Sequence, residues 1–204
     1  MFVRDWMSAP VVTVRGGVSA PEALDLMDCR RVRRLPVVEG GRLVGIVTRS
    51  DLQAALGPAA ARGRGLRVSD VMTPDPATVE RDETLEGAAQ LMLRRKISGL
   101  PVVAGGRVVG IITESDLFRA LCGMLGIGQR GARLTMTVGD EADLLEALRR
   151  RLRGLALRSL VTVRDEGRRR WNVVLRVRGR APAGAATDVR DSASQGERDS
   201  YPPR

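Results

Sequence analysis

Apolar and polar positions follow the same order in two stretches of the chain. In the first stretch, residues 11–14 form a short β-branched run that predicts a strand. Apolar side chains at helical spacing over residues 23–27 predict a helix. Two further apolar runs, residues 35–38 and 43–47, flank a turn and predict a β-hairpin. With a second helix over residues 50–56, the predicted order is β-α-β-β-α.

Residue types at the expected boundaries support these elements. Ser19 is a helix N-cap residue, Pro21 suits a first helical turn, and Glu22 adds an early acid. Two glycines at residues 40–41 predict the tight turn of the hairpin. The Ser-Asp pair at residues 50–51 is expected to cap the second helix.

The second stretch repeats the first with a shift of 65 residues. Residues 3–56 then lie over residues 68–121 without a gap, and about 25 of the 54 positions are identical. Such self-similarity indicates a duplicated structural unit. One copy of about 50 residues makes too small a core to be stable alone, whereas two copies bury each other's sheet faces as a pseudo-twofold pair.

The last third of the chain has a different pattern. A glycine-rich segment at residues 122–128 is typical of a linker, and residues 134–138 then alternate as a strand does. Leucines at helical spacing follow, and residues 157–163 and 171–177 predict two more strands. These leucines are Leu144, Leu145, Leu148 and Leu152. Residues 181–204 have almost no large apolar side chains, so we expect disorder there.

The predicted fold class is α/β (α+β): two β-α-β-β-α repeats, a small β-α-β-β unit and a disordered tail. The expected ranges are residues 1–60 and 66–125 for the repeats, 126–131 for a linker, 132–180 for the small unit and 181–204 for the tail.

Composition narrows the chemistry. The sequence contains no histidine, which removes every Ser-His-Asp, Cys-His and His-ligated metal arrangement. Its two cysteines, Cys29 and Cys122, lie in different segments and form no CxxC pair, so we expect free thiols and no metal site. No apolar run approaches the roughly 20 residues of a membrane helix. Arg4 and Asp5 stand where a signal peptide is apolar, so we expect a cytoplasmic protein. Because no nucleophile–base pair or metal cluster can be assembled from the sequence, we expect that it is not an enzyme.

The net charge of +10 comes almost entirely from arginine and belongs largely to the last third of the chain. Runs at residues 149–151 and 168–170 suit the phosphates of a nucleic acid. Trp171 is the one aromatic residue between residues 146 and 180, so a stacking platform is missing. We therefore expect solvated helix and hairpin faces here, with nucleic-acid binding as an alternative.

Three motifs recur in both copies: Leu-Pro-Val-Val at residues 35–38 and 100–103, Gly-Ile-Val/Ile-Thr-x-Ser-Asp-Leu at residues 45–52 and 110–117, and Asp-x-Met at residues 5–7 and 70–72. These motifs resemble those of the CBS-domain family, and the tandem resembles a Bateman module over residues 3–125. The resemblance implies a regulatory protein that binds AMP, ADP, ATP, S-adenosylmethionine or a related adenosyl ligand in two clefts. It also implies a homodimer formed through the CBS pair.

The residue types at these motifs suit an adenosyl ligand. One carboxylate can accept hydrogen bonds from both ribose hydroxyls, and the resemblance places Asp51 and Asp116 in that role. Hydroxyls and backbone N–H groups at a helix N-terminus offer a phosphate site. The candidate ligand-binding residues are Thr48, Ser50, Asp51, Thr113, Ser115 and Asp116, with Val12, Val32 and Arg33 facing Asp116 and Ala77, Ile97 and Ser98 facing Asp51.

Two alternatives remain open at these residues. The first is that Asp51 is simply a helix-capping residue and Thr48 a strand end, because duplicated folds also repeat their caps. The second concerns three differences between the copies: Arg33 matches Ser98, Arg34 matches Gly99, and Arg49 matches Glu114. If these side chains point into the clefts, the Asp116 cleft favours phosphate charge and the Asp51 cleft is more neutral or empty. Otherwise these three differences lie on the solvent-exposed surface and have no part in binding.

The β-α-β-β order of residues 132–180 resembles the first part of an ACT domain, as in acetoin-utilisation-type CBS–ACT proteins. A second helix and a fourth strand are missing, so an amino-acid ligand is not assigned. The leading hypothesis is a sensor of an adenosyl ligand. The alternatives are an interaction module with empty clefts that assembles with an unidentified regulated protein, or nucleic-acid binding by the basic C-terminal region.

Overall fold

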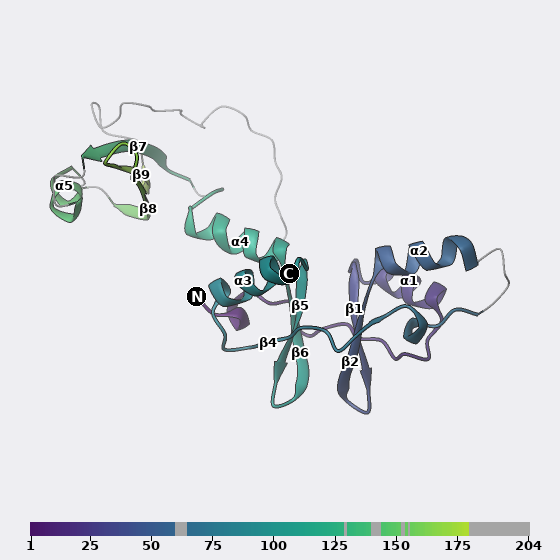
Figure 1. Ribbon diagram of the computed structural model, residues 1–204. Helices are drawn as coiled ribbons and strands as arrows, with labels where there is room; N and C mark the ends of the chain where they lie inside the picture. The colour runs from purple at the N-terminus through teal and green to yellow at the C-terminus, as the bar shows by residue number, and fades with distance from the viewer. Residues whose placement is uncertain (60–64, 129, 140–143, 152–153, 155, 180–204) are drawn as a thin grey trace. The chain divides into compact units, whose positions relative to one another are not determined.

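The computed structural model describes the chain except for residues 60–64, 129, 140–143, 152–153, 155 and 180–204 (Figure 1). The chain divides into two compact units, Met1–Phe118 and Arg119–Arg204. The first unit holds both sequence repeats, and each unit is a mixture of helices and strands. The predicted mixed α/β class is confirmed.

The first repeat is a β-hairpin flanked by two helices. Its elements are α1 (Ala20–Cys29), β1 (Arg34–Glu39), β2 (Arg42–Thr48) and α2 (Arg49–Ala59). Strands β1 and β2 pair antiparallel, and both glycines of the turn between them have positive φ, Gly40 at 55° and Gly41 at 81°. The prediction of a glycine turn is confirmed. Glycine suits both positions because L side chains rarely adopt these angles.

The second repeat has the same hairpin. Its elements are β4 (Val79–Glu80), α3 (Leu85–Arg95), β5 (Gly99–Ala104), β6 (Arg107–Thr113) and α4 (Glu114–Met124), which crosses the boundary between the two units. The hairpins of the two repeats lie side by side with their turns at the same end (Figure 1). The Thr-x-Ser-Asp motifs are therefore at the opposite, helical end of both hairpins.

The predicted strand over residues 11–14 is wrong for most of its length. Only Val14 joins the sheet, through Val14 N to Pro36 O (3.0 Å) and Val38 N to Val14 O (2.9 Å). The reason is that Ser8 is still bonded to Ile111 of the second repeat. The residues between Ser8 and Val14 are used to cross from one repeat to the other, so they run past the sheet instead of along it.

The first residues of the chain belong to the second repeat. Val3 N donates to Glu83 O (2.9 Å), and Ser8 and Ile111 exchange a pair of backbone hydrogen bonds of 2.9 and 3.1 Å. The Val3 side chain is fully buried. The leading segment, residues 1–8, thus completes the sheet of the other copy.

The matching segment between the repeats does the reverse. Val68 N donates to Val18 O (2.9 Å), and the short strand β3 (Thr73–Pro74) pairs with β2 at Ile46 and Gly45. Val68 is buried in the core of the first repeat. Each repeat therefore folds with the leading segment of the other, which ties the two copies into one unit.

Close approach of this crossing segment explains a glycine in β2. A Cβ added at Gly45 would lie 2.5 Å from Met72 Sδ and 3.1 Å from Thr73 O. We expect Gly45→Ala to lower the free energy of unfolding by about 1–3 kcal/mol through overpacking. Gly57→Ala, in the helix α2 with open space around it, should raise it by up to about 1 kcal/mol. Urea unfolding measures both, and equal effects at the two sites would contradict the exchange of segments.

Helix starts follow the predicted capping chemistry in one case and differ in the other. Ser19 is the N-cap of α1 and forms a capping box with Glu22, and Pro21 lies in the first turn, as expected. These hydrogen bonds lower the pKa of Glu22. The second helix begins at Arg49, not after Ser50, and runs to Ala59. The prediction that the Ser-Asp pair caps α2 is therefore wrong in its position: Thr48 is the N-cap residue, and Asp51 takes part in the cap from inside the first turn.

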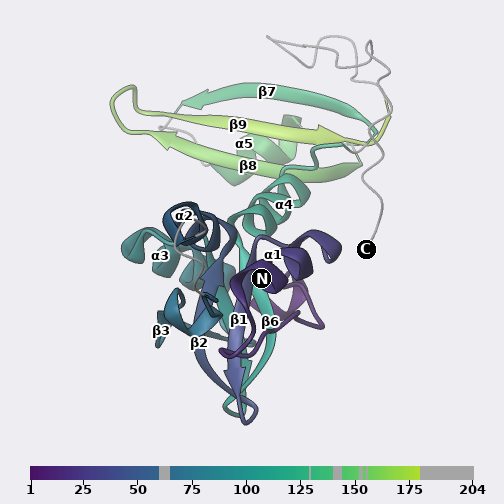
Figure 2. The same cartoon turned by 90° about the vertical axis from the view of Figure 1, so that its right-hand side faces the viewer.

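The second unit is a three-stranded antiparallel sheet with one helix. Its elements are β7 (Ala132–Gly139), α5 (Leu144–Arg151), β8 (Leu157–Asp165) and β9 (Arg170–Val177). The strand order is β7-β9-β8, and α5 lies on one face of the sheet (Figure 2). Leu148 packs there in a core with Leu134, Val138, Val173, Leu175 and Val177.

The glycine-rich segment before this unit is shorter than predicted. Helix α4 extends to Met124, so residues 122–124 are helical and the prediction that the linker begins at residue 122 is wrong. The first turns outside the helix use Gly126 and Gly128, whose φ angles are 64° and 80°. Leu152 and the tail over residues 181–204 lie outside the described residues.

Candidate functional site

The two Thr-x-Ser-Asp motifs form the same hydrogen-bonded turn. In the first repeat, Thr48 N and Thr48 Oγ1 both donate to Asp51 Oδ2, at 3.0 and 2.6 Å, and Asp51 N donates back to Thr48 Oγ1 at 3.3 Å. In the second repeat, Thr113 N and Thr113 Oγ1 donate to Asp116 Oδ2 at 2.8 and 2.6 Å. The first pair is a capping box at the start of α2, and the second makes the same two bonds to the carboxylate at the start of α4.

The capping role does not use up the carboxylate of Asp51. Both of its accepted hydrogen bonds go to Oδ2, and Oδ1 accepts none among the residues that the structure describes. Asp51 is half-buried and Ser50 beside it is exposed, with Ser50 Oγ 3.3 Å from Thr48 Oγ1. The first turn of α2 therefore offers a positioned carboxylate oxygen and a hydroxyl group within reach of a ligand.

The second copy of the motif is more enclosed. Asp116 is 1% exposed, whereas Ser115 is exposed and Thr113 half-buried. Both motifs are held against the strand start of their own repeat: Arg49 N donates to Arg33 O (2.9 Å) and Glu114 N to Ser98 O (3.2 Å). The backbones of Arg33 and Ser98 thus lie at the two helix starts.

The apolar candidates occupy different kinds of position. Val12 and Val32 are half-buried and pack against the core of the first repeat. Ala77 and Ile97 are also half-buried, and Ile97 N is fixed by Met92 O at the end of α3 (3.0 Å). That these four residues line an adenine slot opposite the aspartates remains a prediction.

Arg34 connects the two repeats beside the first motif. It is the ladder partner of Thr48 in the β1–β2 pair, and its Nη2 donates to Ser98 Oγ of the second repeat at 3.0 Å. Burial lowers the pKa of Arg34, Arg33 lowers it further, and Glu114 raises it. Arg34 is missing from the candidate residues chosen from the sequence. The difference between Arg34 and the matched residue Gly99 could have indicated it.

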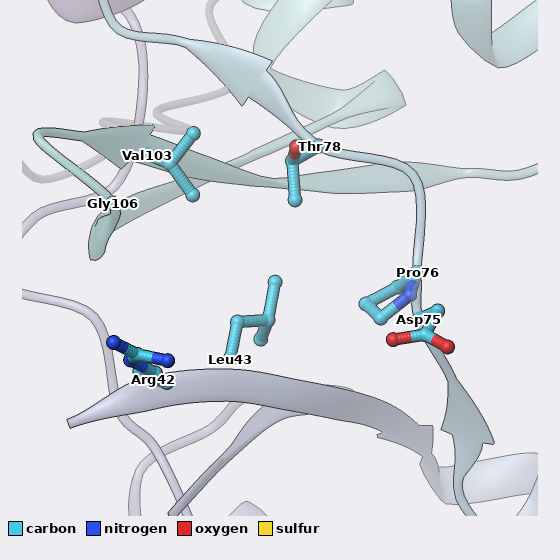
Figure 3. Close-up of a pocket in the computed structure, with 7 residues that line it drawn as sticks. All are labelled: Arg42, Leu43, Asp75, Pro76, Thr78, Val103 and Gly106. Carbon is cyan, nitrogen blue, oxygen red and sulfur yellow. The ribbon is translucent and has the colours of Figure 1, made fainter. Parts of the chain in front are cut away.

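A separate open hollow of about 400 Å³ lies between the hairpins (Figure 3). Its lining consists of Arg42, Leu43, Asp75, Pro76, Thr78, Val103 and Gly106. Leu43 and Val103 point into it from opposite hairpins (Figure 3). Strand β2 runs from Arg42 to Thr48, so the hollow lies about 20 Å from the Thr48 motif at a rise of about 3.3 Å per residue. It is distinct from the predicted clefts.

Two matched hairpins, each followed by a hydrogen-bonded Thr-Asp turn and joined by exchanged leading segments, define a tandem-repeat module. The CBS domain family model matches residues 3–57 and 68–123, which together make up more than half of the chain. The chain belongs to the CBS-domain family. This match ends at residue 123, so the likeness of the second unit to an ACT domain stays a prediction.

Similar proteins include enzymes and separate CBS pairs. An inosine-5'-monophosphate dehydrogenase of Korarchaeum cryptofilum is 41% identical over 109 residues, which cover 53% of this chain and 22% of that enzyme. The chain thus spans less than a quarter of that relative's length. The solved CBS domain pair of protein MJ0100, in complex with 5'-methylthioadenosine and S-adenosyl-L-methionine, is 34% identical with a TM-score of 0.55, covering 60% of this chain and 97% of that one.

A second solved structure is CBSX2 of Arabidopsis thaliana in complex with AMP. It is 36% identical with a TM-score of 0.52 and covers 59% of this chain and 95% of that one. CBS pairs similar to this chain therefore bind adenosyl ligands of different charge.

Proposed function

We propose that this chain is a regulatory module that binds an adenine nucleotide or a related adenosyl ligand beside Asp51 and Asp116. The observation that carries the proposal is the Thr48–Asp51 turn, in which a fixed carboxylate keeps one oxygen without a partner among the described residues. Further support comes from the complexes of MJ0100 and CBSX2 with adenosyl ligands. The proposal includes a cytoplasmic location.

The chemistry of the turn suits a ribose. A carboxylate with one free oxygen can accept from adjacent hydroxyl groups, and such charge-assisted hydrogen bonds are stronger than neutral ones. The hydroxyl of Ser50 and the start of α2 lie next to it, where a helix N-terminus favours negative charge. In this proposal Ala77, Ile97 and Ser98 complete the Asp51 cleft, and Val12, Val32 and Arg33 complete the Asp116 cleft with Thr113 and Ser115.

The proposed role is binding and not catalysis. The sequence has no histidine, the commonest general base, and the proposal assigns the carboxylates of Asp51 and Asp116 to ligand binding. In the part of the chain that the structure describes, no helix is long and apolar enough to span a bilayer.

We also propose a homodimer that forms through the helices of the second repeat. Phe118 on α4 and Leu93 on α3 are 67% and 78% exposed. The matched residues of the first repeat are Gln53 and Asp28, so the repeat fold does not itself require apolar side chains at these positions. Large apolar side chains are enriched in the buried centre of protein interfaces, so an interface would account for these two exposed residues.

Phe118→Gln, which copies the first repeat, is expected to weaken the dimer about tenfold or more, since large aromatic side chains dominate interface energies. Sedimentation velocity at several concentrations measures this. Gln53→Ala at the matched position should leave the association unchanged. A monomer at all concentrations in the unsubstituted protein would contradict the proposed dimer.

The proposed function is tested by calorimetric titration of the full chain with AMP, ADP, ATP, S-adenosylmethionine and 5'-methylthioadenosine at fixed salt. Saturable binding of at least one of these compounds is the expected result. If none binds, the proposal is overturned, and an interaction module with empty clefts becomes the better account.

A further inference from the structure

The side chain of Arg34 lies between Thr48 and Ser98, two residues proposed to lie on opposite sides of the Asp51 cleft. Arg34 and Thr48 are directly opposite in the antiparallel ladder, so their side chains leave the same face of the sheet about 5 Å apart. Thr48 bonds Asp51, whereas the Arg34 guanidinium reaches Ser98 of the other repeat. The Arg34 side chain thus extends from the Thr48–Asp51 turn of the first repeat to Ser98 of the second repeat.

The Arg34 side chain lies in close contact with Gly99 of the second repeat. Gly99, the residue that matches Arg34 in the second repeat, lies directly under the guanidinium: a Cβ there would overlap Arg34 Nη1 and come within 3.0 Å of Cζ. A side chain at residue 99 would therefore have to displace the Arg34 guanidinium from this position. This contact favours a role inside the module for the Arg34–Gly99 difference, and it argues against a solvated surface change.

Burial lowers the pKa of Arg34, and Glu114 attracts its charge and raises the pKa, but the two side chains do not form an ion pair. The hydrogen-bond partner of Arg34 is the neutral hydroxyl of Ser98, and no carboxylate forms an ion pair with Arg34 within the described ranges. Of the other arginines next to the motif, Arg49 is paired with Asp28, whereas Arg33 is exposed. A guanidinium carries five N–H donors, and a phosphate oxyanion is a stronger acceptor than a hydroxyl. A ligand phosphate is therefore a better partner for Arg34 than Ser98 is.

We propose that Arg34 determines the specificity of the Asp51 cleft, favouring adenosyl ligands with a 5'-phosphate over those with a neutral or cationic 5' group. The inference rests on the proposed function. The sequence led us to expect that the Asp51 cleft is the more neutral of the two, and the inference is the opposite. The reason is that Arg34 donates to Ser98, a residue assigned to the Asp51 cleft.

The test compares AMP with 5'-methylthioadenosine, which share adenine and ribose but differ in charge at the 5' position. Calorimetry is performed on the full chain carrying Asp116→Asn, so that the other cleft is weakened. Adding Arg34→Gln should lower the affinity for AMP about 10- to 100-fold, the range of a charge-assisted hydrogen bond, and leave that for 5'-methylthioadenosine unchanged. The matched control, Arg49→Gln, should leave the ratio of the two affinities unchanged.

A second variant moves the arginine instead of removing it. In Arg34→Gly/Gly99→Arg, the preference for AMP should pass to the Asp116 cleft, read in an Asp51→Asn background. Equal losses for both ligands in Arg34→Gln, or an unchanged ratio of affinities, would overturn the inference while leaving the proposed function intact. Absence of any adenosyl binding by the unsubstituted chain would overturn both.

Discussion

Replacing Asp51 with alanine is expected to abolish adenosyl binding at its cleft, with a loss of affinity of about 100-fold or more. In the proposed complex, both ribose hydroxyls donate to the carboxylate, and hydrogen bonds to charged groups contribute about 1.5–3 kcal/mol each. Two such bonds correspond to at least a hundredfold change in the dissociation constant. Calorimetry measures the loss as the disappearance of one class of binding site.

The same substitution also removes a helix cap, which alone costs about 1 kcal/mol of stability. Glu22→Ala separates the two effects, because Glu22 is the carboxylate of the capping box at α1 in the same repeat. This control should lower the melting temperature slightly and leave ligand affinity unchanged. If Asp51→Ala also left the affinity unchanged, Asp51 would be a capping residue only, the alternative that the sequence left open.

Removal of residues 1–8 should destabilise the second repeat more than the first. The deletion removes the buried Val3 side chain and the backbone bonds to Glu83 and Ile111. Burial of one valine and a few hydrogen bonds together stabilise by roughly 3–5 kcal/mol. Hydrogen exchange can locate this loss.

Ile111 N donates to Ser8 O, so its amide should lose protection in the shortened chain. Ile46, the matched residue of the first repeat, pairs with Thr73 instead and should exchange more slowly than Ile111. The reverse order, with Ile46 exposed first, would mean that each leading segment folds on its own copy.

The sequence predicted the repeated elements well because their signals are local. The apolar runs of β1 and β2 and the Ser19 cap are each read from residues close in the chain, and the 65-residue shift repeats these local signals in the second copy. The exchange of leading segments could not be read in this way. Both copies carry the same pattern, so it does not tell which copy of the sheet Val3 or Val68 completes.

The candidate residues of the first motif were chosen from a stretch of four residues, and their role in binding stays a prediction. The hydrogen bond between the side chains of Thr48 and Asp51 comes from the structure and was not predicted. The role of Arg34 depends on a contact with Ser98, 64 positions away in the sequence. Comparison of matched positions pointed to the Arg34–Gly99 difference, but only the structure shows the guanidinium above the glycine.

The central claim is that an adenosyl ligand binds at the helix starts of the repeats, and amide chemical shifts during a titration with AMP test it most directly. The account predicts shifts at Thr48, Asp51 and Thr113, with Asp51→Asn removing those at the first motif. Shifts confined to the hollow at the turn end of the hairpins, around Leu43 and Val103, or no shifts at all, would contradict the account.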